Sequence, residues 1–193
     1  DYSHAEGDST TAQGVASHAE GNSTTAQGYS SHAEGRNTTA QGDHSHAEGL
    51  STTAQGDYSH AEGRNTTAQG YSSHAEGSYT TASGDYSHTE GIGTITTALY
   101  QHATGKWNKL SYTEGAFIVG NGTDDNNRSN LIYAAGNVVE ITGSLNSPNI
   151  TGSLLGTASY AITASYALNA LSTPGGSDTQ IQFNNNNAFD GKI

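Results

Sequence analysis

The sequence lacks cysteine and methionine altogether and has only two prolines and one tryptophan among its 193 residues. Without cysteine it can form neither disulfides nor zinc–thiolate sites. Large apolar residues are almost missing from residues 1–91, which hold Val15, Leu50 and six tyrosines but no Ile, Phe, Met or Trp. An ordinary globular core is therefore excluded over that stretch.

Basic residues are also scarce: 6 Lys and Arg stand against 18 Asp and Glu, for a formal net charge of −12. Phosphate backbones would be repelled, so no nucleic-acid partner is expected. No stretch approaches the ~20 consecutive apolar residues of a transmembrane helix, so we expect no membrane insertion. The chain opens at Asp1 inside a repeat, without an initiator Met or signal peptide, and we expect it to be a piece of a longer protein.

Repetition takes the place of the missing core residues. The pentapeptide S-H-A-E-G, once written S-H-T-E-G, recurs every fourteen residues, and T-T-A-Q-G, once T-T-A-S-G, lies between its copies. Aligned with each other, the two pentapeptides define a seven-residue unit of two variable positions followed by small-X-Ala-X-Gly. The first pentapeptide begins at Ser3, Ser17, Ser31, Ser45, Ser59, Ser73 and Ser87.

The seven-residue spacing does not indicate a coiled coil. A heptad seam needs two apolar positions per unit, whereas this unit offers only Ala, and its Gly costs about 1 kcal/mol in a helix. In an extended strand, alternate side chains point to opposite faces, so Ser17 and Ala19 share one face while His18 and Glu20 share the other. The pattern predicts two short strands per fourteen residues, with the variable pairs at solvent-facing corners that carry no aromatic cluster.

The fold class that fits is all-β, a flattened parallel β-solenoid whose turns are stabilised by stacking on one another. The side chains predicted to fill its interior are alanines that recur every seven residues. They are Ala5, Ala12, Ala19, Ala26, Ala33, Ala40, Ala47, Ala54, Ala61, Ala68, Ala75 and Ala82.

The alternating S-H-A-E-G and T-T-A-Q-G pentapeptides resemble the head repeat of trimeric autotransporter adhesins, which is also found in bacteriophage tail fibres. The resemblance implies a left-handed parallel β-roll and a homotrimer in which the X residues of Ser-X-Ala-X-Gly face the threefold axis. In that family these X residues are aliphatic, whereas this chain has His and Glu there.

We therefore expect His and Glu of neighbouring chains to form a hydrogen-bonded ladder at the trimer contact, with the Thr/Gln face towards solvent. Stacked carboxylates repel one another and are costly to bury unless paired, and imidazoles are the obvious partners. The predicted ladder residues are His4, Glu6, His18, Glu20, His32, Glu34, His46, Glu48, His60, Glu62, His74, Glu76, His88 and Glu90.

Beyond the repeats the composition changes. We expect β-roll repeats over 1–105, a segment of larger side chains capping the roll over 106–140, and a low-complexity trimeric stalk over 141–173. Residues 174–193 are expected to be a linker and the start of a further domain. The run 157–171 is too short to decide between a helical bundle and further β-structure.

The sequence also offers residue types for metal binding, hydrolysis, calcium binding and ice binding. The H-x-E spacing offers metal ligands, but identical sites in every turn favour a structural role, so neither a metal nor another cofactor is predicted. Ser3, His4 and Glu6 have the residue types of a hydrolase triad, yet neighbouring strand residues point to opposite faces, and no catalytic residue is predicted. Asp124 and Asn126 have the spacing of a calcium-binding loop, but the Gly and the terminal Glu of that pattern are missing, so a polar turn is favoured.

The fourth is ice binding. It requires two threonines on one outward face, whereas adjacent Thr24 and Thr25 point to opposite faces.

The interpretation favoured by the sequence is a structural, adhesive segment of an extracellular trimeric fibre on a virion or cell surface. A phage tail fibre or similar appendage is the first reading, because T-A-S-Y-A phrases begin at Thr157 and Thr163, and a bacterial adhesin head is the alternative. The expected partners are two further copies of the chain and a cell-surface glycan or protein receptor.

Overall fold

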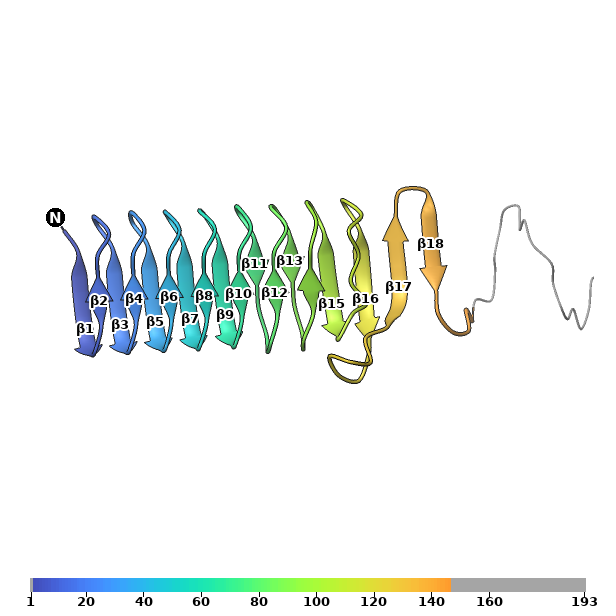
Figure 1. Cartoon of the computed structure of the whole chain (residues 1–193), viewed down its shortest axis with the longest axis horizontal. Coiled ribbons are helices and arrows are strands. Elements are labelled where there is room, and N and C mark those ends of the chain that lie inside the picture. The colour runs from blue at the N-terminus through green and yellow to red at the C-terminus, as the bar shows by residue number, and fades with distance from the viewer. Residues whose placement is uncertain (1, 147–193) are drawn as a thin grey trace, which may run out of the picture. The chain divides into compact units, whose positions relative to one another are not determined.

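The computed structural model describes residues 2–146, and every regular element in this range is a strand. Two sheets face each other (Figure 1). Sheet A begins with eight strands that all start at a histidine, and sheet B contains seven strands of two residues each. The eight are β1 (His4–Asp8), β3 (His18–Asn22), β5 (His32–Arg36), β7 (His46–Leu50), β9 (His60–Arg64), β11 (His74–Ala75), β13 (His88–Thr89) and β15 (His102–Lys106).

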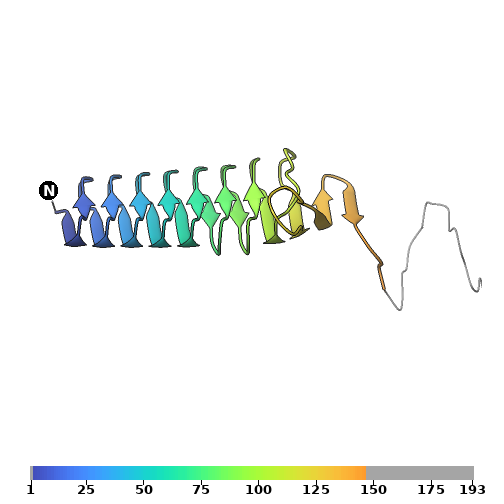
Figure 2. The same ribbon diagram turned by 60° about the horizontal axis from the view of Figure 1, so that its bottom comes forward.

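The chain alternates between the sheets, so one strand of each makes a turn of fourteen residues. Within each sheet the strands are parallel and pair like with like: His4 lies beside His18, and Thr11 beside Thr25. Figure 2 shows the two rows of strands from a second direction. Sheet B consists of β2 (Thr11–Ala12), β4 (Thr25–Ala26), β6 (Thr39–Ala40), β8 (Thr53–Ala54), β10 (Thr67–Ala68), β12 (Thr81–Ala82) and β14 (Ile95–Thr96).

Small side chains fill the space between the sheets. Ser17, Ala19, Thr24 and Ala26 are at most 2% exposed, because alternate positions of both strands point inward. Ala5, which the sequence places in the interior, is instead exposed, and Ala12 is half-buried, because no turn of the described chain stacks on the outer side of β1 and β2. The other interior alanines are fully buried: Ala19, Ala26, Ala33, Ala40, Ala47, Ala54, Ala61, Ala68, Ala75 and Ala82.

The corners need backbone conformations that few residues adopt. Gly49 has φ +108°, and a Cβ there would lie 2.2 Å from the carbonyl oxygen of Gly63 in the next turn. The second residue of each corner pair also has positive φ, for example Ser51 at 57° and Tyr58 at 57°. Glycine therefore recurs in each unit because the next turn leaves no room for a side chain.

Residues after the repeats close sheet B. The amide of Asn108 accepts a hydrogen bond from the Ile95 backbone N–H (2.7 Å) and donates one to the Ile95 carbonyl (2.9 Å). This side chain thus takes the place of the next strand beside β14. Buried Gln101 similarly accepts from the backbone N–H of Thr97 and donates to the carbonyl oxygens of Ser111 and Thr113. Polar amides cap this end of the sheet by satisfying its backbone groups.

Sheet A continues past residue 105. The strand β16 (Phe117–Asn121) is parallel to β15, and β17 (Asn130–Ala135) and β18 (Val138–Ile141) then form an antiparallel hairpin. Between β16 and β17 a loop is held by Arg128, whose guanidinium lies over the Trp107 ring and donates to the Gly93 carbonyl (2.8 Å).

The prediction of an all-β parallel solenoid with fourteen-residue turns, of the left-handed β-roll type, is confirmed. The part of the expected stalk that lies in 147–173, and the linker over 174–193, fall outside the described residues. Residues 2–146 contain no helix long and apolar enough to cross a membrane.

Candidate functional site

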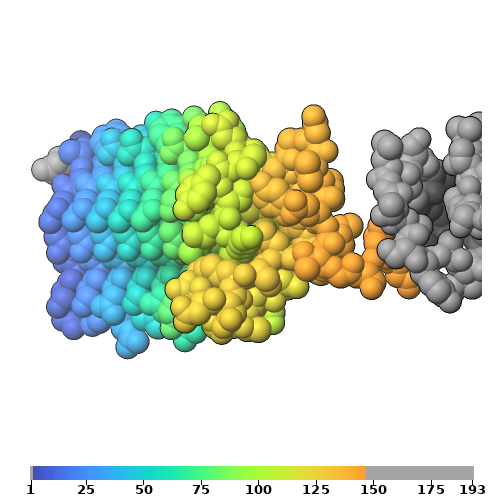
Figure 3. Space-filling view, turned by 45° about the vertical axis from the view of Figure 1, so that its right-hand side comes forward, coloured from blue at the N-terminus to red at the C-terminus, as the bar shows by residue number. Residues whose placement is uncertain are grey.

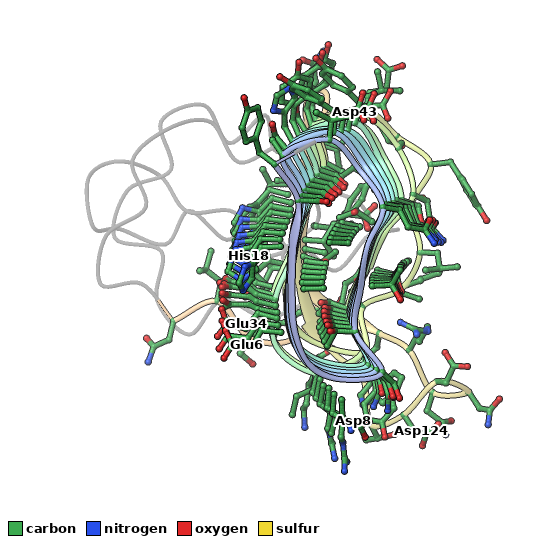
Figure 4. All side chains as sticks on the ribbon, turned by 90° about the vertical axis from the view of Figure 1, so that its left-hand side faces the viewer. Glu6, Asp8, His18, Glu34, Asp43 and Asp124 are labelled. Atoms are coloured by element: carbon green, nitrogen blue, oxygen red, sulfur yellow. The ribbon has the colours of Figure 1, made fainter. Side chains whose placement is uncertain are left out.

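Strict register turns each outward position into a column along the roll. In Figure 3 equivalent side chains of successive turns line up in straight rows, and Figure 4, which looks along the roll, shows His18 and Glu34 projecting from the same side. We name this surface, formed by the outward His and Glu side chains of sheet A, the His/Glu face. The opposite surface, formed by the outward side chains of sheet B, is the Thr/Gln face.

On the His/Glu face the imidazole rings stack. Between His32 and His46 the ring centroids are 4.7 Å apart and the planes differ by 4°, and His46 and His60 are 4.8 Å apart at 5°. These separations equal the spacing of ~4.8 Å between neighbouring strands, so the backbone itself sets the stacking. His102 ends the column against the ring of Phe117.

Burial in this column lowers the pKa of several histidines. Desolvation is the main cause for His32, His46 and His74, and neighbouring imidazoles lower the pKa further, while nearby glutamates act against both effects. The shifts favour the neutral ring at neutral pH. A neutral imidazole has one nitrogen lone pair free to accept a hydrogen bond or to bind a metal ion.

The glutamates lie close to the imidazoles but mostly beyond hydrogen-bond distance. His4 Nε2 is 3.4 Å from Glu6 Oε2, whereas the other His–Glu pairs are separated by 3.6 to 3.9 Å. In the seven rings of the column after His4, one nitrogen is therefore buried without a hydrogen-bond partner among the described residues. These are the Nε2 atoms of His18, His32, His46, His60, His74, His88 and His102.

Beside the glutamates runs a groove of about 690 Å³ over the C-terminal half of the roll. It arises because the glycine that follows each glutamate has no side chain. At the end of the groove, Thr104 occupies the position that Glu has in earlier turns. A hydrogen bond with the Thr104 side chain is the main cause that holds the pKa of Glu90 below its usual value. The groove is lined by Glu48, Glu62, Gly63, Glu76, Gly77, Glu90, Gly91, Thr104 and Gly105.

Comparison with known families agrees with this geometry. The family described as the YadA head domain repeat (2 copies) matches residues 5–31, 19–45, 33–59, 47–68 and 61–87. Residues 5–87 are therefore similar to the YadA head domain repeat, and they form a parallel β-roll. The match supports the adhesin alternative better than the tail-fibre reading, because it rests on the head repeats themselves. No curated protein is matched by the sequence.

The roll does not assemble the residue types of the other chemistries that the sequence suggests. The buried Ser17 hydroxyl donates to the Gly14 carbonyl on the inside, while His18 points outward, so the triad residue types do not meet. Thr24 is buried and Thr25 points outward, so no outward Thr-x-Thr pair forms. Asp124 accepts hydrogen bonds from the backbone of Asn126 and Asn127, as in a polar turn, and the Asn127 side chain is the main cause of its lowered pKa.

One surface of the roll contradicts the expectation that the corners carry no aromatic cluster. From Tyr29 to Tyr100, the corners that follow the T-T-A-Q-G strands present a continuous column of rings with centroids 5.1 to 5.5 Å apart. Asp43 (labelled in Figure 4), Asp57 and Asp85 hold these corners by accepting hydrogen bonds from backbone N–H groups of the preceding turn. We call this column the aromatic edge: Tyr29, His44, Tyr58, Tyr71, Tyr86 and Tyr100.

The signal for the aromatic edge was present in the sequence. If the corner pairs are split into two series at a period of fourteen, one series carries a ring in each turn from Tyr29 to Tyr100. The ring stands in the first position of the pair at Tyr29 and in the second at Tyr58. The other series lies at the opposite end of the cross-section, where Asp8 is drawn in Figure 4, and includes Arg36 and Arg64. When the corner pairs are read as one series with a period of seven, neither the row of aromatic rings nor the position of the arginines can be recognised.

Proposed function

We propose that this chain forms the head of a homotrimeric surface adhesin in which three rolls meet through their His/Glu faces. The observation that carries the proposal is the column of buried, unpaired Nε2 atoms beside a column of glutamates, on a roll built from YadA head repeats. The resemblance to the head repeat of trimeric autotransporter adhesins implies a trimer. Its contact would use the same strand positions, the X residues of Ser-X-Ala-X-Gly. A neutral Nε2–H that donates to a carboxylate of the neighbouring chain satisfies both groups.

The trimer also explains the polarity of the two faces. The Thr/Gln face already suits water, because its side chains are neutral and hydrogen-bond freely. The His/Glu face carries like charges in close register, which repel unless a partner supplies donors. Imidazoles from a second chain are such donors, so we assign this face to the contact and the Thr/Gln face to solvent.

Attachment to a cell surface is the functional part of the proposal, and the extracellular location belongs to it. The aromatic edge supports it: Tyr58, Tyr86 and Tyr100 are more than half exposed, and exposed aromatic rings in a row favour contact with a ligand. The ligand class proposed is a surface glycan or protein. A tail-fibre segment is the second candidate. The observation that favours it is the T-A-S-Y-A phrase, which lies outside the described residues.

The trimer is tested by sedimentation velocity of the whole chain with a chelator present. The double variant His46→Ala and His60→Ala should raise the chain concentration at which half of the chains are trimeric by at least tenfold. The reason is that it removes two hydrogen-bond donors per chain from the contact. Gln41→Ala with Gln55→Ala is the matched control, since these exposed side chains occupy the same turns on the Thr/Gln face.

A wild-type monomer, or a trimer unaffected by the histidine variant, would refute the contact. The same trimer preparation applied to a glycan array then tests attachment, and a set of glycans bound above background is the supporting result.

A further inference from the structure

Three clusters on the His/Glu face bring one imidazole and two carboxylates together. In each, the candidate ligand atoms lie within 4.8 Å of one another. They are the only clusters of this kind among residues 2–146, and each takes its histidine and one glutamate from one turn and its second glutamate from the turn before. The clusters are Glu48–His60–Glu62, Glu62–His74–Glu76 and Glu76–His88–Glu90.

We infer that these clusters bind divalent transition-metal ions such as Zn²⁺ in the groove beside the glutamate column. The donor set is one imidazole nitrogen and two carboxylate oxygens, and these are ligands that zinc accepts in proteins, with water completing the coordination. The ligands of each ion come from one chain, so the zinc site needs no partner chain. The clusters use the same imidazole and carboxylate atoms as the proposed trimer contact, so at each cluster a bound ion and the interchain hydrogen bond exclude each other.

The imidazoles already present a donor in the right place. The Nε2 atoms of His60, His74 and His88 are buried, have no hydrogen-bond partner among the described residues, and lie near the carboxylate row. His88 Nε2, for example, is 3.6 Å from Glu76 Oε1. That separation is too long for a hydrogen bond and close to the ~3.4 Å between two ligands of a tetrahedral zinc ion with bonds of about 2.0–2.1 Å.

The carboxylates can complete the site by small movements. The side chains of Glu48, Glu62, Glu76 and Glu90 are about one third to two fifths exposed, so their rotamers are free to close the remaining distance. They open onto the groove, which gives an ion a route in. Among the residues that the structure describes, neither Lys nor Arg forms an ion pair with these glutamates, so their charges lack a cationic partner.

Shared ligands limit the number of ions. Glu62 and Glu76 each belong to two clusters, so with no bridging carboxylate the outer two clusters fill and one chain binds two ions. A third ion requires both shared glutamates to bridge. The N-terminal turns have the same residue types without such a cluster: Glu6 is 72% exposed, against 31% for Glu76.

The experiment is equilibrium dialysis of the untagged, chelator-treated whole chain against Zn²⁺ at pH 7.5, with zinc per chain measured by atomic absorption. Wild type should bind two ions, or three if the shared glutamates bridge. The triple variant His60→Gln, His74→Gln, His88→Gln should bind none. The matched control His4→Gln, His18→Gln, His32→Gln removes three histidines of the same column outside the clusters and should bind as wild type.

Two double glutamate variants provide a second test, in case the triple histidine variant misfolds. Glu62→Gln with Glu76→Gln touches every cluster and should also abolish binding, whereas Glu6→Gln with Glu20→Gln should not. Substitution with Co²⁺ gives an independent readout, because ligation by His60 or His88 produces visible absorption bands that the triple variant loses. Less than one zinc ion per wild-type chain at tens of micromolar Zn²⁺, or equal loss in the control variants, would overturn the inference.

Discussion

At the scale of single residues, the roll depends on the absence of side chains as much as on their presence. Gly49 stacks directly on Gly63, so the backbones of successive turns touch where they bend. Interior positions up to residue 96 hold only Ala, Ser and Thr, and Ser hydroxyls donate hydrogen bonds to corner carbonyls, as Ser45 does to Gly42 (2.6 Å). The repeat is therefore constrained at its small residues by close packing between turns.

Gly49→Ala should destabilise the head by at least ~3 kcal/mol, because the added Cβ meets backbone atoms that cannot move aside and φ is unfavourable for alanine. Gly115→Ala is the matched control: its φ is +66°, but nothing lies within 4 Å of the added Cβ. It should cost only the ~1–2 kcal/mol of the left-handed conformation. Chemical denaturation followed by circular dichroism measures both. Equal effects would show that stacking of glycines on one another is unimportant.

At the scale of elements, the unit that can be added or removed is the fourteen-residue turn. The two strands of a turn are interchangeable inside the roll, since both present a small residue and Ala to the interior, but their outward side chains differ. Thr25 lies on the opposite face from His18. A shift by one seven-residue unit would thus preserve the interior and exchange the faces.

Deleting residues 45–58 joins His44 to Ser59 and keeps every column in register, so the shortened chain should still melt cooperatively. Deleting residues 45–51 joins His44 to Thr52 and places Thr53 over His32, so the histidine column is divided between two faces. We expect the second variant to retain β-structure by circular dichroism but to melt at a lower temperature than the first. Equal melting temperatures would mean that stacking of the outward columns does not stabilise the roll.

At the scale of the whole molecule, charge and burial are unevenly distributed. The His/Glu face holds most of the titratable groups of the roll, and the two corners carry aromatic rings on one side and Arg36 and Arg64 on the other. His32 lies between the rings of His18 and His46, with Glu20 and Glu34 facing it. Its pKa is lowered, chiefly by burial, from the ordinary histidine value of 6.5.

This shift predicts that acid weakens the head. Because the unfolded chain takes up the His32 proton at higher pH than the folded chain does, the stability contributed by neutral His32 is complete above about pH 6.5 and decreases as pH falls through the unfolded value towards the folded one. With a chelator present, the melting temperature should be lower at pH 5.5 than at pH 7.5. His32→Gln should show a smaller decrease, whereas Gln27→Ala, on the Thr/Gln face, should keep the full decrease.

The sequence by itself determined the strands, their fourteen-residue turns and which residues face inward, because in a strand alternation alone assigns the faces and only tiny residues repeat on one of them. It also indicated His and Glu as outward columns. The tertiary structure alone decided the rest. Stacking of the turns left Nε2 atoms such as that of His60 buried and unpaired, and the fold placed the Asn108 side chain where the next strand beside β14 would lie. These features depend on distances between turns, which one turn's sequence does not contain.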